Sequence, residues 1–375
     1  MKNHKVLVLG NQLDHEGGVV GFNNMLLSNF SSDDFSLYYF SYGSRTNLFK
    51  YYYLKRFLYI FYYVHDLIKF IKILVKLNDI RIVQINPSLV AVSLFRDTLF
   101  VLIAKFFNKK VIVNYHGWKY KTFSFLKLFP IKKLFNYIFQ NNTHQLVLSL
   151  SFKNDLKILS KKANSISVIT TGVEINNIVL KKNRYDNVIK VLFLGRIQKR
   201  KGFLELVNAI IELQKTNMLH HFHFNFVGHE FRTGFIKKMI KKLIHSGVEK
   251  QYFTFHGRVI GKEKYRLYSR NDIFILPSYT EGCPVSVLEA LCSGLTCVTT
   301  PVGALNDIIN KNNGLLIKKK NPDDIVRKLL YIYENDNLIS NEFSKKISNE
   351  SSKLYSIKSI CNKYLNIYKK IVDER

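Results

Sequence analysis

Short apolar runs recur along the chain and alternate with longer segments of helical pattern. Runs of this kind predict parallel strands that are buried on both faces. Parallel strands are joined by crossovers, and the intervening segments are long enough to be the connecting helices. We therefore predict an α/β fold of two Rossmann-like doubly wound sheets, with strands at Val6–Gly10, Ile82–Asn86, Val111–Tyr115, Leu146–Leu148, Val191–Leu194, Phe222–Val227, Phe253–Phe255, Ile273–Leu276 and Thr296–Thr299.

The chain has 375 residues, which suits two domains better than one core. The polar stretch Val179–Asn187 precedes a new apolar strand and is the best candidate for a linker. We expect an N-terminal domain at 1–182 and a C-terminal domain at 187–354, with a helix at 355–375 that packs back on the first. Glycines at strand ends and turns concentrate in the second domain, which favours ligand binding there.

Composition indicates a packed protein inside the cell. Hydrophobic residues make up 47% of the chain and aromatic residues 14%, well above the level of a disordered chain. The start of the chain lacks the apolar core of a signal peptide, and charged residues interrupt the most apolar region, so we expect no spanning helix. The cysteines lack C-x-x-C spacing, which fits a reducing compartment; they are Cys283, Cys292, Cys297 and Cys361.

The formal net charge of +30 attracts polyanions, so nucleic acid and anionic lipid are candidate partners, and compositional bias is the alternative. Residues 50–76 and 119–133 mix aromatic residues with lysines, as interfacial amphipathic helices do. Ordinary helices packed on a sheet with lysines in water have the same pattern. We find no motif of a nucleic-acid reader and expect no specific nucleic-acid partner. A cytoplasmic protein that rests on the inner face of the membrane accounts for both segments.

Two carboxylates flank a predicted helix start after the strand that ends at Leu276. Pro284 indicates a helix that begins there, with Glu281 in the preceding loop and Glu289 about one turn inside. The free N–H groups and dipole of a helix N-terminus bind phosphate. Alternatively, one glutamate complements the helix dipole and the other is solvated.

A second cluster follows the strand Val191–Leu194, where Gly195-Arg196 precedes Lys201-Gly202. Ligands of open α/β sheets bind at the carboxyl ends of strands, and a guanidinium with an ammonium could neutralise a diphosphate. The alternative is a basic surface loop, because Lys199 and Arg200 are also cationic.

Together these motifs resemble the donor domain of the large retaining glycosyltransferase family 4, which has the GT-B fold. The resemblance rests on Gly195-Arg196-x4-Lys201-Gly202, Glu281-x7-Glu289, Thr300-Pro301-Val302-Gly303 and Asn313-Gly314-Leu315-Leu316, in this order. It implies two domains that face each other across a cleft. By resemblance, Arg196 and Lys201 hold the donor diphosphate, and Glu289 binds the ribose hydroxyls. Glu281 and the amides of Gly282, Cys283, Pro284 and Val285 contact the sugar and its phosphate, while Arg258 and Val259 mark the base site.

The first domain carries fainter signs of the same family. Gly17-Gly18 resembles the family's glycine loop near donor and acceptor, and His116 matches a histidine near the reacting sugar. A histidine at a strand end is otherwise often structural. Gly282-Cys283-Pro284 stands where many relatives have Gly-Phe-Gly, and His229-Glu230 replaces a small or acidic turn, so the donor is not fixed by the motifs.

The resemblance implies a hexosyltransferase that moves a hexosyl or N-acetylhexosaminyl unit from a nucleoside diphosphate sugar, with UDP favoured over GDP. A saccharide, expected to be lipid-linked, would accept it in bacterial cell-surface polysaccharide synthesis, lipopolysaccharide included. We expect no cofactor and no metal, because the chain has no D-x-D pair. The alternative is a sugar-nucleotide epimerase of the same fold.

Overall fold

The structure is a computed structural model. It describes residues 4–15, 17–43, 52–77, 79–89, 91–118, 120–159, 165–182 and 187–373, and only the backbone of 52–59, 88–89, 91–93 and 120–121. Residues 50–51 and 119 of the two lysine-rich aromatic segments lie outside the described residues. The same holds for 183–186 of the expected linker and for the last two residues of the expected C-terminal helix.

The chain divides into two compact units. Unit 1 comprises Met1–Thr171 and Ile357–Arg375, and unit 2 comprises Gly172–Ser356. The expected end of the first domain is residue 182, whereas the first segment of unit 1 ends at Thr171. The reason is that residues 172–182 pack on unit 2: Val173 belongs to its core, and the N–H groups of Lys181 and Lys182 bind the carbonyls of Ser293 and Ser269.

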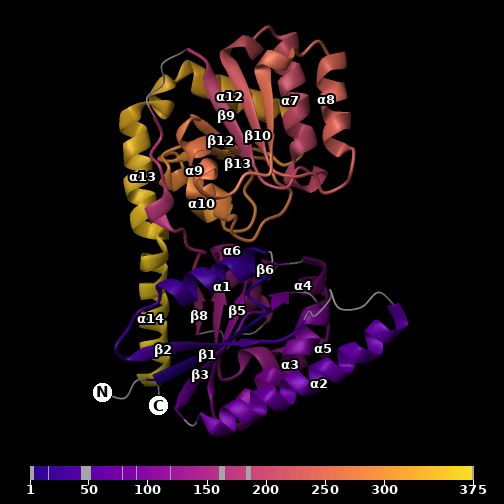
Figure 1. Cartoon of the computed structure of the whole chain (residues 1–375), viewed down its shortest axis with the longest axis vertical. Helices are drawn as coiled ribbons and strands as arrows, with labels where there is room; N and C mark the ends of the chain where they lie inside the picture. The colour runs from indigo at the N-terminus through magenta and orange to yellow at the C-terminus, as the bar shows by residue number, and fades with distance from the viewer. Residues whose placement is uncertain are drawn as a thin grey trace. The chain divides into compact units, whose positions relative to one another are not determined.

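Unit 1 contains a six-stranded parallel sheet in the order β2-β1-β3-β5-β7-β8 (Figure 1). The switch in strand order lies between β1 and β3, where Val6 is in register with Ile82. The strands are β1 His4–Gly10, β2 Phe35–Ser41, β3 Ile80–Ile85, β5 Lys110–Tyr115, β7 Thr143–Val147 and β8 Ile166–Val168, and a small pair joins β4 Ser88–Leu89 with β6 Gly117–Trp118.

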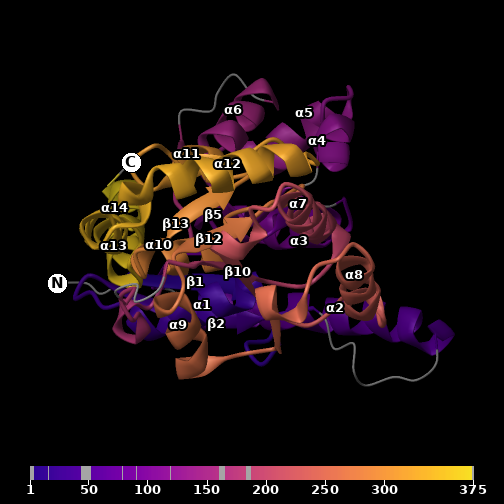
Figure 2. The ribbon, with the colours of Figure 1, turned by 90° about the horizontal axis from the view of Figure 1, so that it is seen from above.

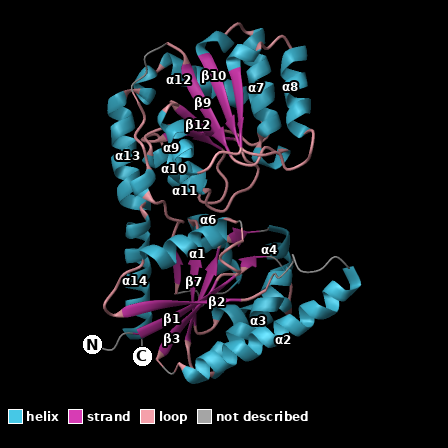
Figure 3. Ribbon diagram, in the orientation of Figure 1, coloured by secondary structure: helices cyan, strands magenta, loops and turns pink. Residues whose placement is uncertain are grey.

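Helices cover both faces of this sheet (Figure 3). α1 packs against the C-terminal helix α14 over a core that includes Val6, Ile82 and Ile112, while α2 and α3 lie against each other on the opposite face. The helices are α1 Gly18–Asn29, α2 Tyr52–Lys76, α3 Ala91–Phe106, α4 Tyr120–Leu126, α5 Ile131–Phe135, α6 Leu150–Leu159 and α14 Ile357–Asp373. Within the described residues, none of the helices is both long and apolar enough to cross a membrane.

Unit 2 has a second six-stranded parallel sheet, in the order β11-β10-β9-β12-β13-β14. Its order reverses between β9 and β12, where Val191 is in register with Ile273. The strands are β9 Ile189–Leu194, β10 Phe222–Val227, β11 Phe253–Gly257, β12 Ile273–Leu276, β13 Thr296–Thr299 and β14 Gly314–Leu316.

The helices of unit 2 form two layers on its sheet. Viewed from above, α7, α8 and α12 lie on one side and α9 and α10 on the other (Figure 2); α13 packs on α10. The helices are α7 Phe203–Lys215, α8 Phe235–His245, α9 Gly261–Ser269, α10 Val285–Cys292, α11 Leu305–Ile308, α12 Pro322–Glu334 and α13 Asn341–Tyr355. The prediction of two doubly wound parallel sheets is confirmed.

Candidate functional site

The loops after β9 and β12 meet at the switch point of unit 2. Because β9 connects away to β10 while β12 continues in the other direction, their carboxyl ends open a crevice that ligands of such sheets occupy. Arg196 and Lys201 follow β9, and Glu281 follows β12. Both sequence clusters therefore arrive at one place.

Backbone contacts hold these two loops together. Gly202 has a left-handed φ of 72°, and a Cβ atom there would lie 1.9 Å from the carbonyl oxygen of Pro277. One step further, the Tyr279 N–H donates to the carbonyl of Arg200 at 3.0 Å. Gly202 thus allows the start of α7 to touch the loop that carries Glu281.

Substituting this glycine tests how much the contact contributes. We expect Gly202→Ala to lower the free energy of unfolding by about 3 kcal/mol, because the new Cβ meets backbone at a strained φ. Gly195→Ala is the matched control, since nothing lies within 4 Å of its Cβ position. Urea unfolding followed by circular dichroism measures both. Equal stability of the two variants would contradict the proposed close approach.

Lys201 and Glu281 form the centre of this crevice. The Lys201 ammonium lies 2.6 Å from Glu281 Oε1, and the Ser278 hydroxyl donates to the same oxygen at 2.5 Å. The Lys201 side chain is 23% exposed and that of Glu281 9%, so the pair is partly shielded while the ammonium is still accessible. Ser278 is a contact that the sequence motifs had not indicated.

Arg196 lies in the same loop, two residues after β9. Its side chain is exposed and has no acidic partner among the described residues. A guanidinium in this state can bind phosphate oxygens at little desolvation cost. Together with Lys201 it gives the crevice two cations against one carboxylate.

α10 follows the loop that carries Glu281. The helix begins at Val285, directly after Pro284, so the predicted helix start is confirmed. Its first N–H groups have no intrahelical partners and carry the positive end of the dipole. Gly303 supports the loop in front of this helix: its φ is 57°, and a Cβ there would lie 2.4 Å from the carbonyl oxygens of Glu281 and Gly282. The Thr300-Pro301-Val302-Gly303 motif therefore lies directly against the backbone of Glu281 and Gly282.

Glu289 is buried, which excludes its interpretation as a solvated helix residue. Oε1 lies 2.6 Å from the Lys264 ammonium, and the Tyr268 hydroxyl donates to Oε2 at 3.0 Å. Burial opposes the charge of Lys264, yet the Glu289 carboxylate outweighs it and raises the pKa of the ammonium. Burial and the same carboxylate raise the pKa of Tyr268, which therefore acts as a hydrogen-bond donor at neutral pH.

Lys264 and Tyr268 are residues that the sequence motifs missed. Both lie on α9, one turn apart, and their spacing alone is that of any helix face. The same helix follows the loop that contains Arg258 and Val259, where Arg258 is exposed and Val259 packs against the core of unit 2. One short helix therefore links the expected base site to Glu289.

A further acidic contact borders the crevice. The Tyr279 hydroxyl donates to Glu205 Oε1 in the first turn of α7, and Glu205 Oε2 is buried without a partner among the described residues. Burial and this hydrogen bond raise the pKa of Tyr279. This hydrogen bond joins α7 to the loop between β12 and Glu281.

Unit 1 brings its own three candidates near one another. Gly17 precedes α1, which starts at Gly18, and both glycines have open space where a Cβ would be. Phe22 of α1 lies 5.1 Å from the His116 ring, centroid to centroid. His116 is half-buried, accepts a hydrogen bond from Asn114 at Nε2, and burial lowers its pKa to about 4. The imidazole is thus neutral at physiological pH.

Among the residues that the structure describes, no group of three or more His, Cys, Asp or Glu side chains could hold a metal ion. The cation that contacts Glu281 is the Lys201 ammonium, 2.6 Å from Oε1.

Comparison with known proteins shows which proteins this chain is similar to. Residues 188–335, most of unit 2, match the family model described as Glycosyl transferases group 1. The whole chain superposes on sucrose-phosphate synthase from Thermosynechococcus elongatus, with a TM-score of 0.74, 15% identity and 100% of both chains covered. The chain has the GT-B fold, and its second unit is similar to the glycosyltransferases of group 1.

Sequence relatives support this class. An uncharacterized glycosyltransferase of Methanocaldococcus jannaschii is 28% identical over 74% of both chains. The N,N'-diacetylbacillosaminyl-diphospho-undecaprenol alpha-1,3-N-acetylgalactosaminyltransferase of Campylobacter jejuni is 36% identical over 27% of both chains. The UDP-Gal:alpha-D-GlcNAc-diphosphoundecaprenol alpha-1,3-galactosyltransferase of Escherichia coli is 24% identical over 54% of both chains. The matches to these last two span about half or less of each relative.

Proposed function

We propose that the protein is a retaining hexosyltransferase that uses a nucleoside diphosphate sugar, UDP-linked rather than GDP-linked, and a lipid-linked saccharide acceptor in bacterial cell-surface polysaccharide synthesis. The observation that carries the proposal is the placement of Arg196 and the Lys201–Glu281 pair before the N-terminus of α10. The names of the Campylobacter and Escherichia relatives, with their diphospho-undecaprenol-linked substrates, support the choice of acceptor.

The proposed chemistry stabilises a leaving diphosphate. Negative charge builds on the diphosphate as its bond to the sugar breaks, and Arg196, Lys201 and the α10 amides offer it positive charge. Glu281, held by Lys201 and Ser278, has its carboxylate fixed beside that point. In the proposed mechanism the acceptor attacks the sugar on the same face from which the diphosphate leaves. Such a mechanism needs no pair of carboxylates with the spacing found in glycosidases. We expect turnover to persist in EDTA.

A second part of the proposal places unit 1 on an anionic membrane. Along α2, a stripe of large apolar side chains is exposed, and the opposite stripe, with Phe70 and Leu74, is buried. From Phe61 onward the exposed residues recur every three or four positions, and the first of them lies four positions before Val64, so they share one helix face; they are Ile60, Phe61, Val64, Ile68, Ile71 and Val75. Lys69, Lys72 and Lys76, also exposed, flank this stripe. Apolar side chains beside lysines suit the boundary between acyl chains and anionic headgroups.

Other elements of unit 1 also expose large apolar side chains. α3, which packs beside α2, exposes Phe95 and Phe106 at 83% each. The segment from α4 to α5 exposes Phe129 at 82% and Leu134 at 60%. Ordinary helices packed on a sheet with lysines in water would have a mainly polar outer face. That alternative does not account for the exposed apolar side chains of these segments.

A donor panel tests the proposed reaction. Purified protein is incubated in EDTA with UDP-, GDP- or ADP-sugars and a membrane lipid extract, and release of nucleoside diphosphate is measured. We expect UDP release that requires the extract, and an α-linked product by NMR. A β-linked product would overturn retention, a requirement for added divalent cation would overturn metal independence, and release from GDP-sugars alone would overturn the donor assignment.

Membrane binding has its own test in α2. We expect Phe61→Ser with Ile68→Ser to reduce co-sedimentation with phosphatidylglycerol vesicles at least about tenfold, because buried apolar area drives insertion. The control is Tyr331→Ser, which removes an exposed aromatic side chain of unit 2. Undiminished vesicle binding of the α2 variant would contradict the membrane assignment. A wild-type dimer that the same substitutions convert to monomers would contradict it as well.

A further inference from the structure

Two polar side chains lie on central strands of the unit 1 sheet, where a doubly wound fold favours apolar ones. Gln84 on β3 is fully buried, and Asn114 on β5 is 1% exposed. Each of them meets a buried tyrosine of α14. Tyr368 donates to Gln84 Oε1 at 2.8 Å, whereas Asn114 Nδ2 donates to the hydroxyl of Tyr364 at 2.7 Å. The Asn114 contact continues to His116, the candidate site residue that directly follows β5.

The amide nitrogen of Asn114 faces two neighbours. Its Nδ2 atom lies 2.9 Å from His116 Nε2 and 2.7 Å from the Tyr364 hydroxyl oxygen. An amide nitrogen carries two N–H groups and cannot accept, so both neighbours must be acceptors. An imidazole nitrogen that accepts carries no proton, which places the proton of the neutral ring on Nδ1. Burial also disfavours the charged ring and lowers the pKa of His116 to about 4.

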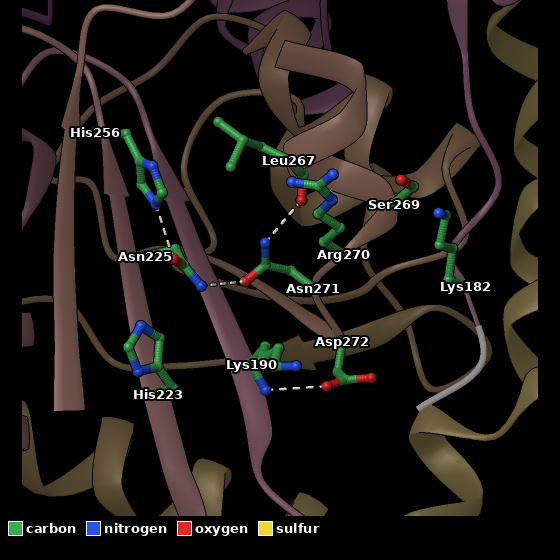
Figure 4. A pocket seen from close by; sticks show the side chains of 10 residues that line it. All are labelled: Lys182, Lys190, His223, Asn225, His256, Leu267, Ser269, Arg270, Asn271 and Asp272. Carbon is green, nitrogen blue, oxygen red and sulfur yellow. Dashed lines mark hydrogen bonds between the residues drawn. The ribbon is translucent and has the colours of Figure 1, made fainter. Parts of the chain in front are cut away.

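An asparagine–histidine pair in unit 2 has the opposite arrangement (Figure 4). Asn271 donates to the carbonyl of Leu267 at 2.7 Å, so its oxygen is left to accept from Asn225 Nδ2 at 2.9 Å. Asn225 therefore turns its own oxygen to His256 Nε2, 2.8 Å away, and His256 must carry a proton on that nitrogen. The other neighbour of the asparagine thus decides which nitrogen of the histidine is protonated.

Packing holds the Tyr364 hydroxyl beside Asn114. Tyr364 is 1% exposed, and the ring of Phe22 on α1 lies 6.0 Å from the Tyr364 ring and 5.1 Å from the His116 ring, between centroids. Burial raises the pKa of Tyr364, so the hydroxyl keeps its proton and is an uncharged partner. The three side chains therefore have little room to rearrange.

We propose that Asn114 and Tyr364 are positioning residues, which hold His116 as its Nδ1–H tautomer so that Nδ1 can donate a hydrogen bond to the donor sugar. His116 Nδ1 has no hydrogen-bond partner among the residues that the structure describes. A donor that is fixed in advance needs no reorganisation during the reaction. The contact with the sugar rests on the proposed function and on the resemblance that places His116 near it, whereas the tautomer rests on unit 1 alone.

Nitrogen NMR measures the tautomer directly, because protonated and unprotonated ring nitrogens have different 15N shifts. The full-length protein, labelled with 15N in its histidines, is measured without ligand, and His116→Gln and His256→Gln variants assign the two signals. We expect the proton of His116 on Nδ1 and that of His256 on Nε2. Tyr364→Phe keeps the ring but leaves the Asn114 amide without its second partner. It should therefore give a mixture of tautomers at His116 and leave His256 unchanged.

Turnover shows whether the tautomer contributes to transfer. We expect Tyr364→Phe to lower kcat about three- to tenfold with less change in KM for the donor, the range for one lost hydrogen bond. Tyr368→Phe is the matched control, since it removes a buried hydroxyl of the same helix that contacts Gln84 instead. It should keep kcat within about twofold. In an Asn114→Ala background, Tyr364→Phe should have no further effect on kcat, because it acts through Asn114.

The possible outcomes separate this inference from the proposed function. An Nε2–H tautomer of His116 in the wild-type protein, or an unchanged single tautomer in Tyr364→Phe, would overturn the positioning role even where transfer is confirmed. Equal losses of kcat in Tyr364→Phe and Tyr368→Phe would also overturn it, since they would reflect general damage to α14. The tautomer is measured without a donor, so it decides the inference even if no donor is turned over.

Discussion

Replacing Lys201 by alanine is expected to lower kcat about 10²- to 10³-fold, the usual loss when one group that stabilises developing negative charge is removed. The Lys201 ammonium lies 2.6 Å from Glu281, at the crevice between β9 and β12. Its removal takes one of two cations from the proposed diphosphate site and frees the Glu281 carboxylate to repel the donor. Steady-state release of nucleoside diphosphate measures the effect.

Three variants separate this loss from damage to the fold. Lys199→Ala removes an exposed lysine of the same loop and is expected to keep kcat within about twofold. Lys201→Arg retains the charge and should recover part of the activity, although a guanidinium differs from an ammonium in shape. Urea unfolding checks that Lys201→Ala is stable. A stable Lys201→Ala protein with unchanged kcat would exclude a role in transfer.

The sequence revealed all the central strands of both sheets and one edge strand, β11. Val191–Leu194 and Phe222–Val227 are continuous apolar or alternating runs, and both are found as strands. β2, β8 and β14 were missed, and each of them forms an edge of its sheet. An edge strand has one neighbour and less burial; β2 has only Phe35 and Phe40 fully covered. Its pattern therefore lacks the apolar run that identifies central strands.

The sequence predicted only those site residues that belong to a motif at the end of a strand. Arg196, Lys201 and Glu281 follow strand ends, and strand order alone brings such loops together. Lys264, Tyr268 and Ser278 approach the two glutamates through tertiary packing, which no local spacing encodes. With 57 lysines and arginines in the chain, one partner lysine cannot be singled out from sequence. The domain boundary was misplaced for a related reason, because the polar stretch follows a segment that already packs on unit 2.

Glu289→Gln is expected to raise KM for the donor about 10- to 100-fold while kcat changes less, because hydrogen bonds to a charged group contribute about 1.5–3 kcal/mol. The family resemblance implies that Glu289 holds the ribose, so we propose that it takes no part in bond breaking. Its carboxylate is fixed by Lys264 and Tyr268, so the substitution also leaves Lys264 without its partner. Donor titrations give KM, and urea unfolding gives the stability of the variant.

Lys264→Met distinguishes binding from stability. If the unpaired ammonium causes the loss of stability in Glu289→Gln, adding Lys264→Met should restore the free energy of unfolding but leave KM high, since the ribose contact is still absent. Lys264→Met alone should raise KM less, because the Tyr268 hydroxyl still holds Oε2. Recovery of KM in the double variant would mean that Glu289 acts only by neutralising Lys264. The ribose assignment would then be wrong.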